Sequence, residues 1–155
     1  AGWPPSTSAA EMRSIVGEIT RAGVRVSLFI DPVRAAVDWA AAAGADRVEL
    51  YTEPFAAAFA RGGDEAARSF ARYVDAAEHA HARGLGVNAG HDLDLENLRL
   101  FRTLPHLDEV SIGHALVAHA LWVGLDRSVR DYLAVLAGHV PAGGESGTRP
   151  SRMIK

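Results

Sequence analysis

The sequence contains no cysteine, a single lysine and no long apolar run. Without cysteine, disulfide bonds and thiolate chemistry are excluded. Lys155 is the only lysine, so almost all of the positive charge is carried by arginine. No apolar segment approaches the roughly 20 residues that a membrane-spanning helix needs. The formal net charge of −3 gives no basic surface for nucleic acid.

The first eleven residues also lack the basic and apolar regions of a secretory signal peptide. We therefore expect a soluble, cytoplasmic protein without a membrane or nucleic-acid partner. A chain of 155 residues, 48% of them hydrophobic, can build one substantial core. We expect a single α/β domain over residues 1–137. Residues 138–155 show no hydrophobic periodicity and are expected to form a disordered tail.

Short apolar segments alternate with amphipathic ones along the chain. Strands are predicted at 24–30, 46–52, 85–90 and 108–113. Helices are predicted at 8–22, 31–44, 64–83 and 95–104, and from 115 to 136 with a break near Gly124. Asp31 and Pro32 are expected to be the N-cap and the first residue of the second helix.

Strands that are separated by helices, without hairpin turns, predict a parallel βα repeat. The apolar beginnings of the strands suggest a sheet that is covered on both faces. This pattern suits either a small open sheet or half of a (β/α)8 barrel.

Polar residues gather where the predicted strands end, which is the edge at which α/β folds form their sites. His91 follows the third strand, and the small residues before it allow a ligand to approach the backbone. A histidine titrates near neutral pH, which suits proton transfer. From the spacing alone, a catalytic His91 and a solvated loop residue beside an N-cap at Asp92 or Asp94 are equally good interpretations.

Two further positions could carry chemistry at the same edge. Gly113 and His114 lie where a strand meets the N-terminus of a helix, a natural seat for a phosphate, although a tight turn that needs glycine explains them too. Glu49 alternates with apolar neighbours and would point into the interior of a barrel. There it would be either a catalytic carboxylate or half of a structural ion pair, and the polar residues at the same edge favour catalysis.

The remaining histidines show no metal-binding pattern. A metal site built from His91, Asp92 and His114 would need Glu49 or Asp31 as a further ligand, and no pair has the helical spacing of a zinc motif, so we expect no metal. His79 and His81, two residues apart on a helix, are expected to be surface residues. No partner is expected for the others, which are His106, His119 and His139.

Four segments together resemble the pyridoxine 5′-phosphate synthase family of vitamin B6 biosynthesis. They are VSLFIDP (26–32), GADRVELYT (44–52), GLGVNAGHDLDLENL (84–98) and DEVSIGHALVAHAL (108–121). They occur in the order and spacing of the family and span the chain from about Glu11 to Leu136.

The resemblance implies the C-terminal half of a TIM (β/α)8 barrel. It implies a transferase that condenses 1-deoxy-D-xylulose 5-phosphate with 3-amino-2-oxopropyl phosphate, without cofactor or metal. The products are pyridoxine 5′-phosphate, inorganic phosphate and water. By the same resemblance, His91 is the proton donor and Glu49 stabilises the charged transition state. Asp92, Gly113 and His114 hold the phosphate of the aminoketone.

The sequence also departs from the family. A complete barrel needs about 250 residues, so the first four strands are expected to be missing, and the isolated chain is expected to be inactive. Glu53 and Phe55 stand where the family usually has glycine and tyrosine, and the tail beyond Gly138 is not family-like. An alternative is a non-catalytic half-barrel that binds phosphate or self-associates, since a homo-oligomer could close the ring of strands.

Overall fold

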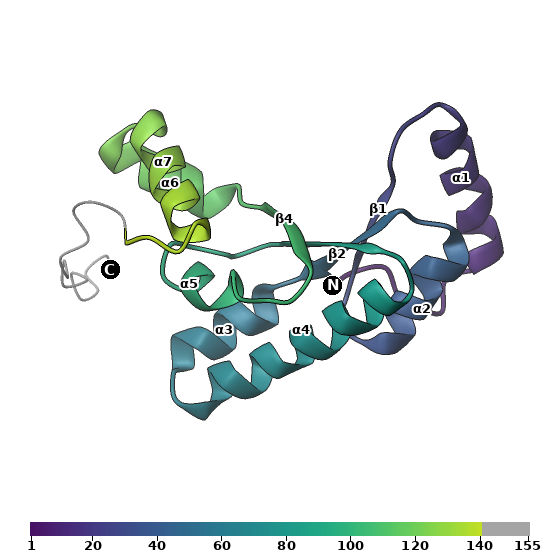
Figure 1. Ribbon diagram of the computed structural model, residues 1–155, viewed down its shortest axis with the longest axis horizontal. Coiled ribbons are helices and arrows are strands. Elements are labelled where there is room, and N and C mark those ends of the chain that lie inside the picture. Colours follow the sequence, from purple (N-terminus) through teal and green to yellow (C-terminus); the bar gives the residue numbers. More distant parts are fainter. Residues whose placement is uncertain (141–155) are drawn as a thin grey trace, which may run out of the picture.

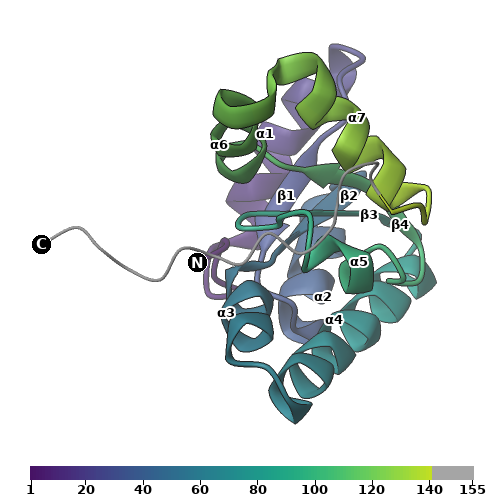
Figure 2. The ribbon, with the colours of Figure 1, turned by 90° about the vertical axis from the view of Figure 1, so that its left-hand side faces the viewer.

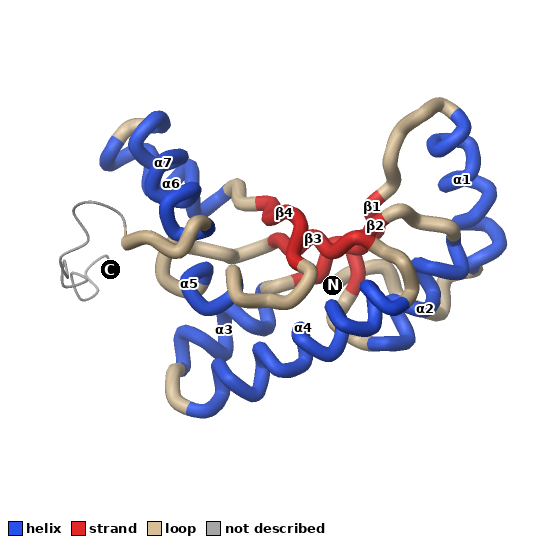
Figure 3. The backbone as a smooth tube through the Cα atoms, viewed as in Figure 1, coloured by secondary structure: helices blue, strands red, loops and turns tan. Residues whose placement is uncertain are grey.

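The computed structural model describes residues 1–140 of the chain. It is an α/β structure in which a parallel sheet curves through the middle of the molecule (Figures 1 and 3). The strands are β1 (Ser27–Ile30), β2 (Arg47–Tyr51), β3 (Gly86–Gly90) and β4 (Leu107–Ser111). The helices are α1 (Ala9–Arg21), α2 (Arg34–Ala43), α3 (Glu53–Arg61), α4 (Asp64–Ala82), α5 (Leu98–Phe101), α6 (His114–Val123) and α7 (Leu125–Leu136).

The four strands lie in the order β1-β2-β3-β4, and every neighbouring pair is parallel. The predicted parallel βα repeat is therefore confirmed. The register places Glu49 opposite Asn88 and Tyr51 opposite Gly90. Because the strands run in the same direction in near register, the polar residues that follow them meet at one edge of the sheet.

In β1 and β2 buried residues alternate with more exposed ones, which corrects the expectation of a sheet covered on both faces. In β2, Val48 and Leu50 are fully buried, whereas Glu49 between them is half-buried. Figures 1 and 2 show α2, α3 and α4 together on one side of the sheet. The sheet thus has one face packed against helices and a second, more polar face.

An aromatic cluster fills the space between α3, α4 and α5. Phe55, Tyr73 and Phe101 are almost fully buried. Their ring centroids lie 5.0 Å apart for Phe55–Phe101 and 5.3 Å apart for Tyr73–Phe101. The Tyr73 hydroxyl donates a hydrogen bond to the carbonyl oxygen of Tyr51, at 2.7 Å, and so ties this cluster to the end of β2. Burial raises the pKa of the Tyr73 phenol.

Two local expectations are wrong. The segment after β2 had no predicted helix, yet α3 forms there, with Pro54 in its first turn and Phe55 in the core. The helix predicted from Asp31 begins three residues later, at Arg34, with Val33 at the N-cap. Asp31 instead accepts a hydrogen bond from the backbone N–H of Gly2, at 3.2 Å.

The first residues of the chain lie against the outer edge of β1. The backbone N–H of Trp3 donates to the carbonyl oxygen of Phe29, at 2.8 Å. The Trp3 ring stacks on Trp39 of α2, whose indole N–H donates to the carbonyl oxygen of Thr7. The segment before α1 is therefore part of the packed structure.

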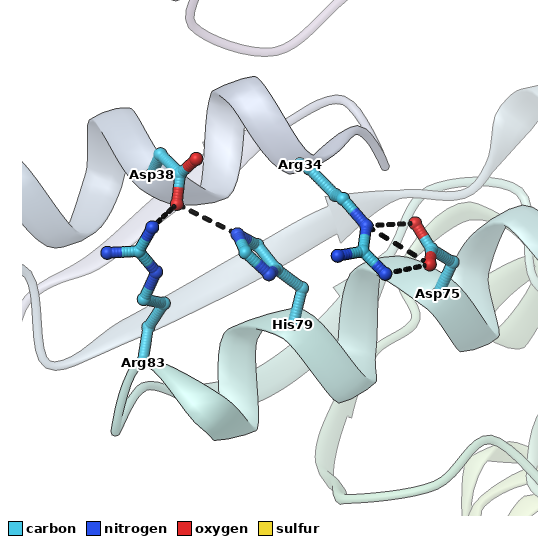
Figure 4. A network of polar contacts seen from close by, with 5 residues as sticks. All are labelled: Arg34, Asp38, Asp75, His79 and Arg83. Atoms are coloured by element: carbon cyan, nitrogen blue, oxygen red, sulfur yellow. Dashed lines mark hydrogen bonds and ion pairs between the residues drawn. The ribbon is translucent and has the colours of Figure 1, made fainter.

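A polar network joins α2 and α4 on the sides that face each other (Figure 4). Arg34 binds Asp75 with both nitrogens of its fork, and Asp38 is contacted by Arg83 and His79. The side chain of His79 is only 16% exposed. The expectation that His79 is a simple surface residue is therefore wrong, because the packing of α2 on α4 brings Asp38 to 2.8 Å from its ring.

Helix α1 and the α6–α7 pair stand at opposite ends of the long axis (Figure 1). His119 of α6 contacts Asp131 of α7, at 3.2 Å, and Arg127 contacts the same carboxylate, at 2.8 Å. His119 thus has a partner that the sequence pattern did not reveal. His106 also has a neighbour, since its ring stacks on that of His81, with centroids 3.7 Å apart.

Within residues 1–140, no helix has the length and apolar character to cross a membrane. The predicted disordered tail begins at Gly138, and its part from residue 141 onward lies outside the described residues.

Candidate functional site

A cleft of about 240 Å³ opens at the carboxyl ends of β3 and β4. It is lined by the loop after β3 and by the turn that leads from β4 into α6. Its lining residues are His91, Asp92, Leu93, Ser111, Ile112, Gly113, His114 and Ala115. Four of the five residues predicted to form the site therefore share one cleft, and Glu49 adjoins it through Ser111.

His91 occupies an uncommon backbone conformation at the entrance of this cleft. Its φ angle is +86° and that of Asp92 is +59°, in the left-handed region that residues other than glycine seldom adopt. Such conformations cost on the order of 1 kcal/mol each and persist where the surroundings impose them. The His91 ring packs edge-on against Tyr51, at 5.1 Å, and its Nδ1 lies 3.3 Å from a carboxylate oxygen of Asp92.

Asp94 caps the turn that leads into α5, whose own N-cap is Asn97, and this bears on the two interpretations of the loop. The Asp94 side chain accepts hydrogen bonds from the backbone N–H groups of Glu96 and Asn97, at 2.9 and 2.8 Å. Asp92 makes no such bond and points its carboxylate towards His91. Capping therefore explains the position of Asp94. It does not explain the positions of His91 and Asp92.

Glu49 reaches towards the cleft from β2, one of the two inner strands. The Ser111 hydroxyl donates to its Oε2, at 3.4 Å. A side chain at Gly90 would place its Cβ 2.4 Å from the Glu49 carboxylate, so the glycine at this position makes room for the acid. Glu49 makes no ion pair in the described structure, since the nearby Arg47 pairs with Asp108 and Glu109. The structural ion pair considered for Glu49 is thus absent among residues 1–140.

The turn between β4 and α6 leaves the N-terminus of α6 open. Gly113 is the N-cap, and no side chain caps the first turn. A Cβ at Gly113 would meet nothing within 4 Å, so open space lies beside its backbone. Unpaired N–H groups at a helix N-terminus attract anions. His114, the first residue of the helix, adds a side chain that can carry a proton.

Three residues of the site escaped the sequence analysis. Thr52, fully buried, donates its hydroxyl to the carbonyl oxygen of Gly90, at 2.6 Å, and to that of His91. Asn97 donates its side-chain amide to the carbonyl oxygen of Asp92, at 3.0 Å. Ser111 contacts Glu49. The only signal for Thr52 and Ser111 was their place at the ends of strands.

Over the residues that the structure describes, no group of three or more potential ligands is arranged to hold a metal ion. The chemistry available at this edge consists of imidazole and carboxylate groups and of open backbone amides. These groups suit proton transfer and anion binding.

The parallel sheet places the protein in the α/β class, and histidine, carboxylate and an open helix N-terminus lie at the carboxyl edge, where proteins of this class form their sites. The family is given by comparison with known proteins. The family model described as pyridoxal phosphate biosynthesis protein PdxJ matches residues 1–138. The chain belongs to this family.

Two similar proteins are both named pyridoxine 5′-phosphate synthase. The pyridoxine 5′-phosphate synthase of Cytophaga hutchinsonii is 50% identical over 137 residues, which cover 88% of this chain and 56% of that protein. The protein of the same name from Porphyromonas gingivalis is 49% identical over 138 residues, 88% of this chain and 57% of that protein. The chain therefore spans little more than half the length of the curated relatives it matches.

Proposed function

We propose that this chain forms the C-terminal half of a (β/α)8 barrel with pyridoxine 5′-phosphate synthase activity. The reaction condenses 1-deoxy-D-xylulose 5-phosphate with 3-amino-2-oxopropyl phosphate and gives pyridoxine 5′-phosphate, inorganic phosphate and water. Such an enzyme is a transferase and works in solution on small phosphorylated substrates. The observation that carries the proposal is the cleft shared by His91, Asp92, Gly113 and His114 in a chain of the PdxJ family.

Each residue has a role that fits its surroundings. His91 donates a proton to the reacting molecule, because it lines the cleft and its Nδ1 lies beside the Asp92 carboxylate, which can orient the ring. Glu49 stabilises positive charge that develops in the transition state, since it adjoins the cleft without a cationic partner. The amides at Asp92 and Gly113 and the side chain of His114 hold the phosphate of the aminoketone.

The fold supports the half-barrel in two ways. All four strands are parallel, and in β2 Val48 and Leu50 are buried, whereas Glu49 between them points to the opposite face. In a closed barrel that other face is the interior, which is where a catalytic carboxylate belongs. The relatives are long enough to supply the remaining strands.

Complementation tests this proposal. The N-terminal part of the Cytophaga hutchinsonii relative, co-expressed with this chain, is expected to restore formation of pyridoxine 5′-phosphate from the two substrates, whereas the isolated chain is expected to be inactive. His91→Asn should lower the turnover of the reconstituted enzyme by about 10²–10⁴-fold, the usual contribution of a general acid.

The matched control is His81→Asn, at the end of α4 and away from the cleft, which should leave the rate unchanged. If the reconstituted enzymes with His91→Asn and with His81→Asn are equally active, His91 does not take part in the proton transfer.

Apolar side chains beside both outer strands favour a second candidate function. Ile15 and Ile19 are exposed on α1, which precedes β1 in the chain, and Leu121 and Trp122 are 82% and 88% exposed on α6, which follows β4. We propose as the alternative a non-catalytic, phosphate-binding chain that self-associates, with two copies closing one ring of strands.

Size-exclusion chromatography with light scattering separates the two candidates. A monodisperse dimer that binds phosphate but forms no product supports the second. A monomer that gains activity only with the N-terminal part of a relative supports the first.

A further inference from the structure

Thr52 lies directly behind the loop that carries His91. It follows the last residue of β2 and is fully buried. Its backbone N–H donates to the carbonyl oxygen of Gly90, at 3.0 Å, and its hydroxyl donates to the same oxygen, at 2.6 Å. The hydroxyl also contacts the carbonyl oxygen of His91. One residue thus holds the two peptide groups on either side of the His91 Cα.

Helix capping does not explain this threonine. Thr52 occupies the N-cap position of α3, where a threonine normally accepts a hydrogen bond from the first turn of the helix. Its side chain makes no such bond. The hydroxyl instead points to Gly90 at the end of the neighbouring strand β3, a residue 38 positions away from Thr52 in the sequence. Thr52 thus makes a hydrogen bond to a residue distant in sequence in place of the usual local capping bond, and this arrangement depends on the tertiary structure.

The loop that Thr52 contacts needs such support. His91 and Asp92 both have positive φ angles, and neither is glycine. On the far side of the loop, Asn97, only 3% exposed, donates its side-chain amide to the carbonyl oxygen of Asp92, at 3.0 Å. The unusual backbone is therefore held at its entrance by Thr52 and at its exit by Asn97.

We propose that Thr52 is a positioning residue for His91: its hydroxyl fixes the Gly90–His91 backbone so that the imidazole packs against Tyr51 and faces the cleft. The importance of this role for the reaction rests on the proposed function. The positioning itself is a property of this chain and can be measured without turnover.

The test uses the full chain and nuclear magnetic resonance of the His91 ring. In the unmodified protein we expect a nuclear Overhauser contact between His91 and Tyr51, whose ring centroids lie 5.1 Å apart. Thr52→Val keeps the shape of the side chain and removes the hydroxyl. It should abolish this contact, shift the His91 ring signals and weaken the binding of inorganic phosphate in the cleft about tenfold.

Thr52→Ser restores the hydroxyl without the methyl group and should restore the contact and the ring signals. The control is Thr103→Val, because the Thr103 hydroxyl also donates to a backbone carbonyl, that of Leu100, at 2.7 Å, but in an exposed turn away from the cleft. It should leave His91 unchanged.

Retention of the His91–Tyr51 contact in folded Thr52→Val would overturn the proposal, as would its loss in folded Thr52→Ser. If Thr52→Val does not fold, the exchange of hydroxyl protons with water is measured in the unmodified protein. A Thr52 hydroxyl proton that exchanges as fast as that of Thr103 would also overturn the proposal. If the protein binds no phosphate and forms no product even with a complementing half, the proposed function is wrong. The positioning role of Thr52 is still tested in that case, because the contact between His91 and Tyr51 is measured without substrate.

Discussion

The two helical regions that flank the sheet differ sharply in how they are packed. Helices α3, α4 and α5 enclose an aromatic cluster in which Phe55, Tyr73 and Phe101 are almost fully buried. Helix α6 is strongly apolar in composition, yet none of its residues is buried, and Leu121 and Trp122 are largely exposed. Its neighbour α7 buries four residues, among them Asp131 and Tyr132.

This difference shows that apolar content alone does not tell where the core of this chain lies. The α3–α5 region is complete within residues 1–140, because its apolar faces meet one another. The surface of α6 is the kind of exposed apolar patch that marks an interaction site. In the proposed barrel it would be covered by a complementing half, and in the alternative by a second copy.

The largest expected effect lies in the aromatic cluster. Phe55→Ala should lower the free energy of unfolding by about 3–5 kcal/mol, because it leaves a cavity among four aromatic rings. Leu121→Ala in α6 should change it by less than about 0.5 kcal/mol, since the side chain is already in water. Urea denaturation followed by circular dichroism measures both. Equal losses in the two variants would show that α6 is packed in solution.

A smaller effect is expected where α6 meets α7. Asp131→Asn should destabilise the chain by roughly 2 kcal/mol, since it weakens hydrogen bonds from Arg127 and His119 to a carboxylate that is 9% exposed. Asp126→Asn is the matched control on the same helix. Its ion pair with Arg130 is exposed and should be worth no more than about 0.5 kcal/mol. If the control costs as much as Asp131→Asn, burial does not set the strength of these pairs.

The exposed surface of α6 should affect association more than folding. The double variant Leu121→Ser, Trp122→Ser is expected to unfold within about 1 kcal/mol of the unmodified chain, because both side chains are largely in water. Any dimer detected by light scattering should become monomeric, and Val140→Ser, which changes an exposed apolar residue outside α6 and α7, should not alter it. A dimer that survives the double variant would place the interface elsewhere.

The smallest effect concerns the polar network between α2 and α4. The hydrogen bond from Arg34 holds the pKa of Asp75 below its usual value. A lowered pKa in the folded state contributes stability that is present above the unfolded pKa, near 4, and is lost as the pH falls through the folded pKa. The melting temperature should therefore fall below about pH 4, and less so in Asp75→Asn.

Glu78→Gln, on the same helix, is the control for loss of a negative charge. An unchanged pH dependence in Asp75→Asn would mean that this exposed pair contributes nothing measurable.

Some residues of the candidate site could be predicted from the sequence, and others could not. His91, Glu49, Asp92, Gly113 and His114 could be named because each stands at or near the end of an apolar segment, and parallel strands end at one edge. Four of them line one cleft and Glu49 adjoins it through Ser111, whereas their roles as a site stay predictions. Thr52 and Asn97 could not be named, because their partners lie on other elements or on a backbone turn that no local pattern encodes.

The fold was accessible for a similar reason. Hydrophobic periodicity and glycine breaks determine where strands and most helices form, and the absence of hairpin turns determines parallel pairing. Helix α3 was not predicted, although Pro54 in its first turn is typical of a helix start, and Phe55 packs it into the core.

The sequence by itself determined the βα repeat, the edge that carries the polar residues and the family. Only the tertiary structure decided which apolar faces are buried, which histidines have partners and how the His91 backbone is held. Local patterns fix local conformation, whereas these features depend on contacts between residues far apart in sequence, such as Thr52 and Gly90 or Asp38 and His79.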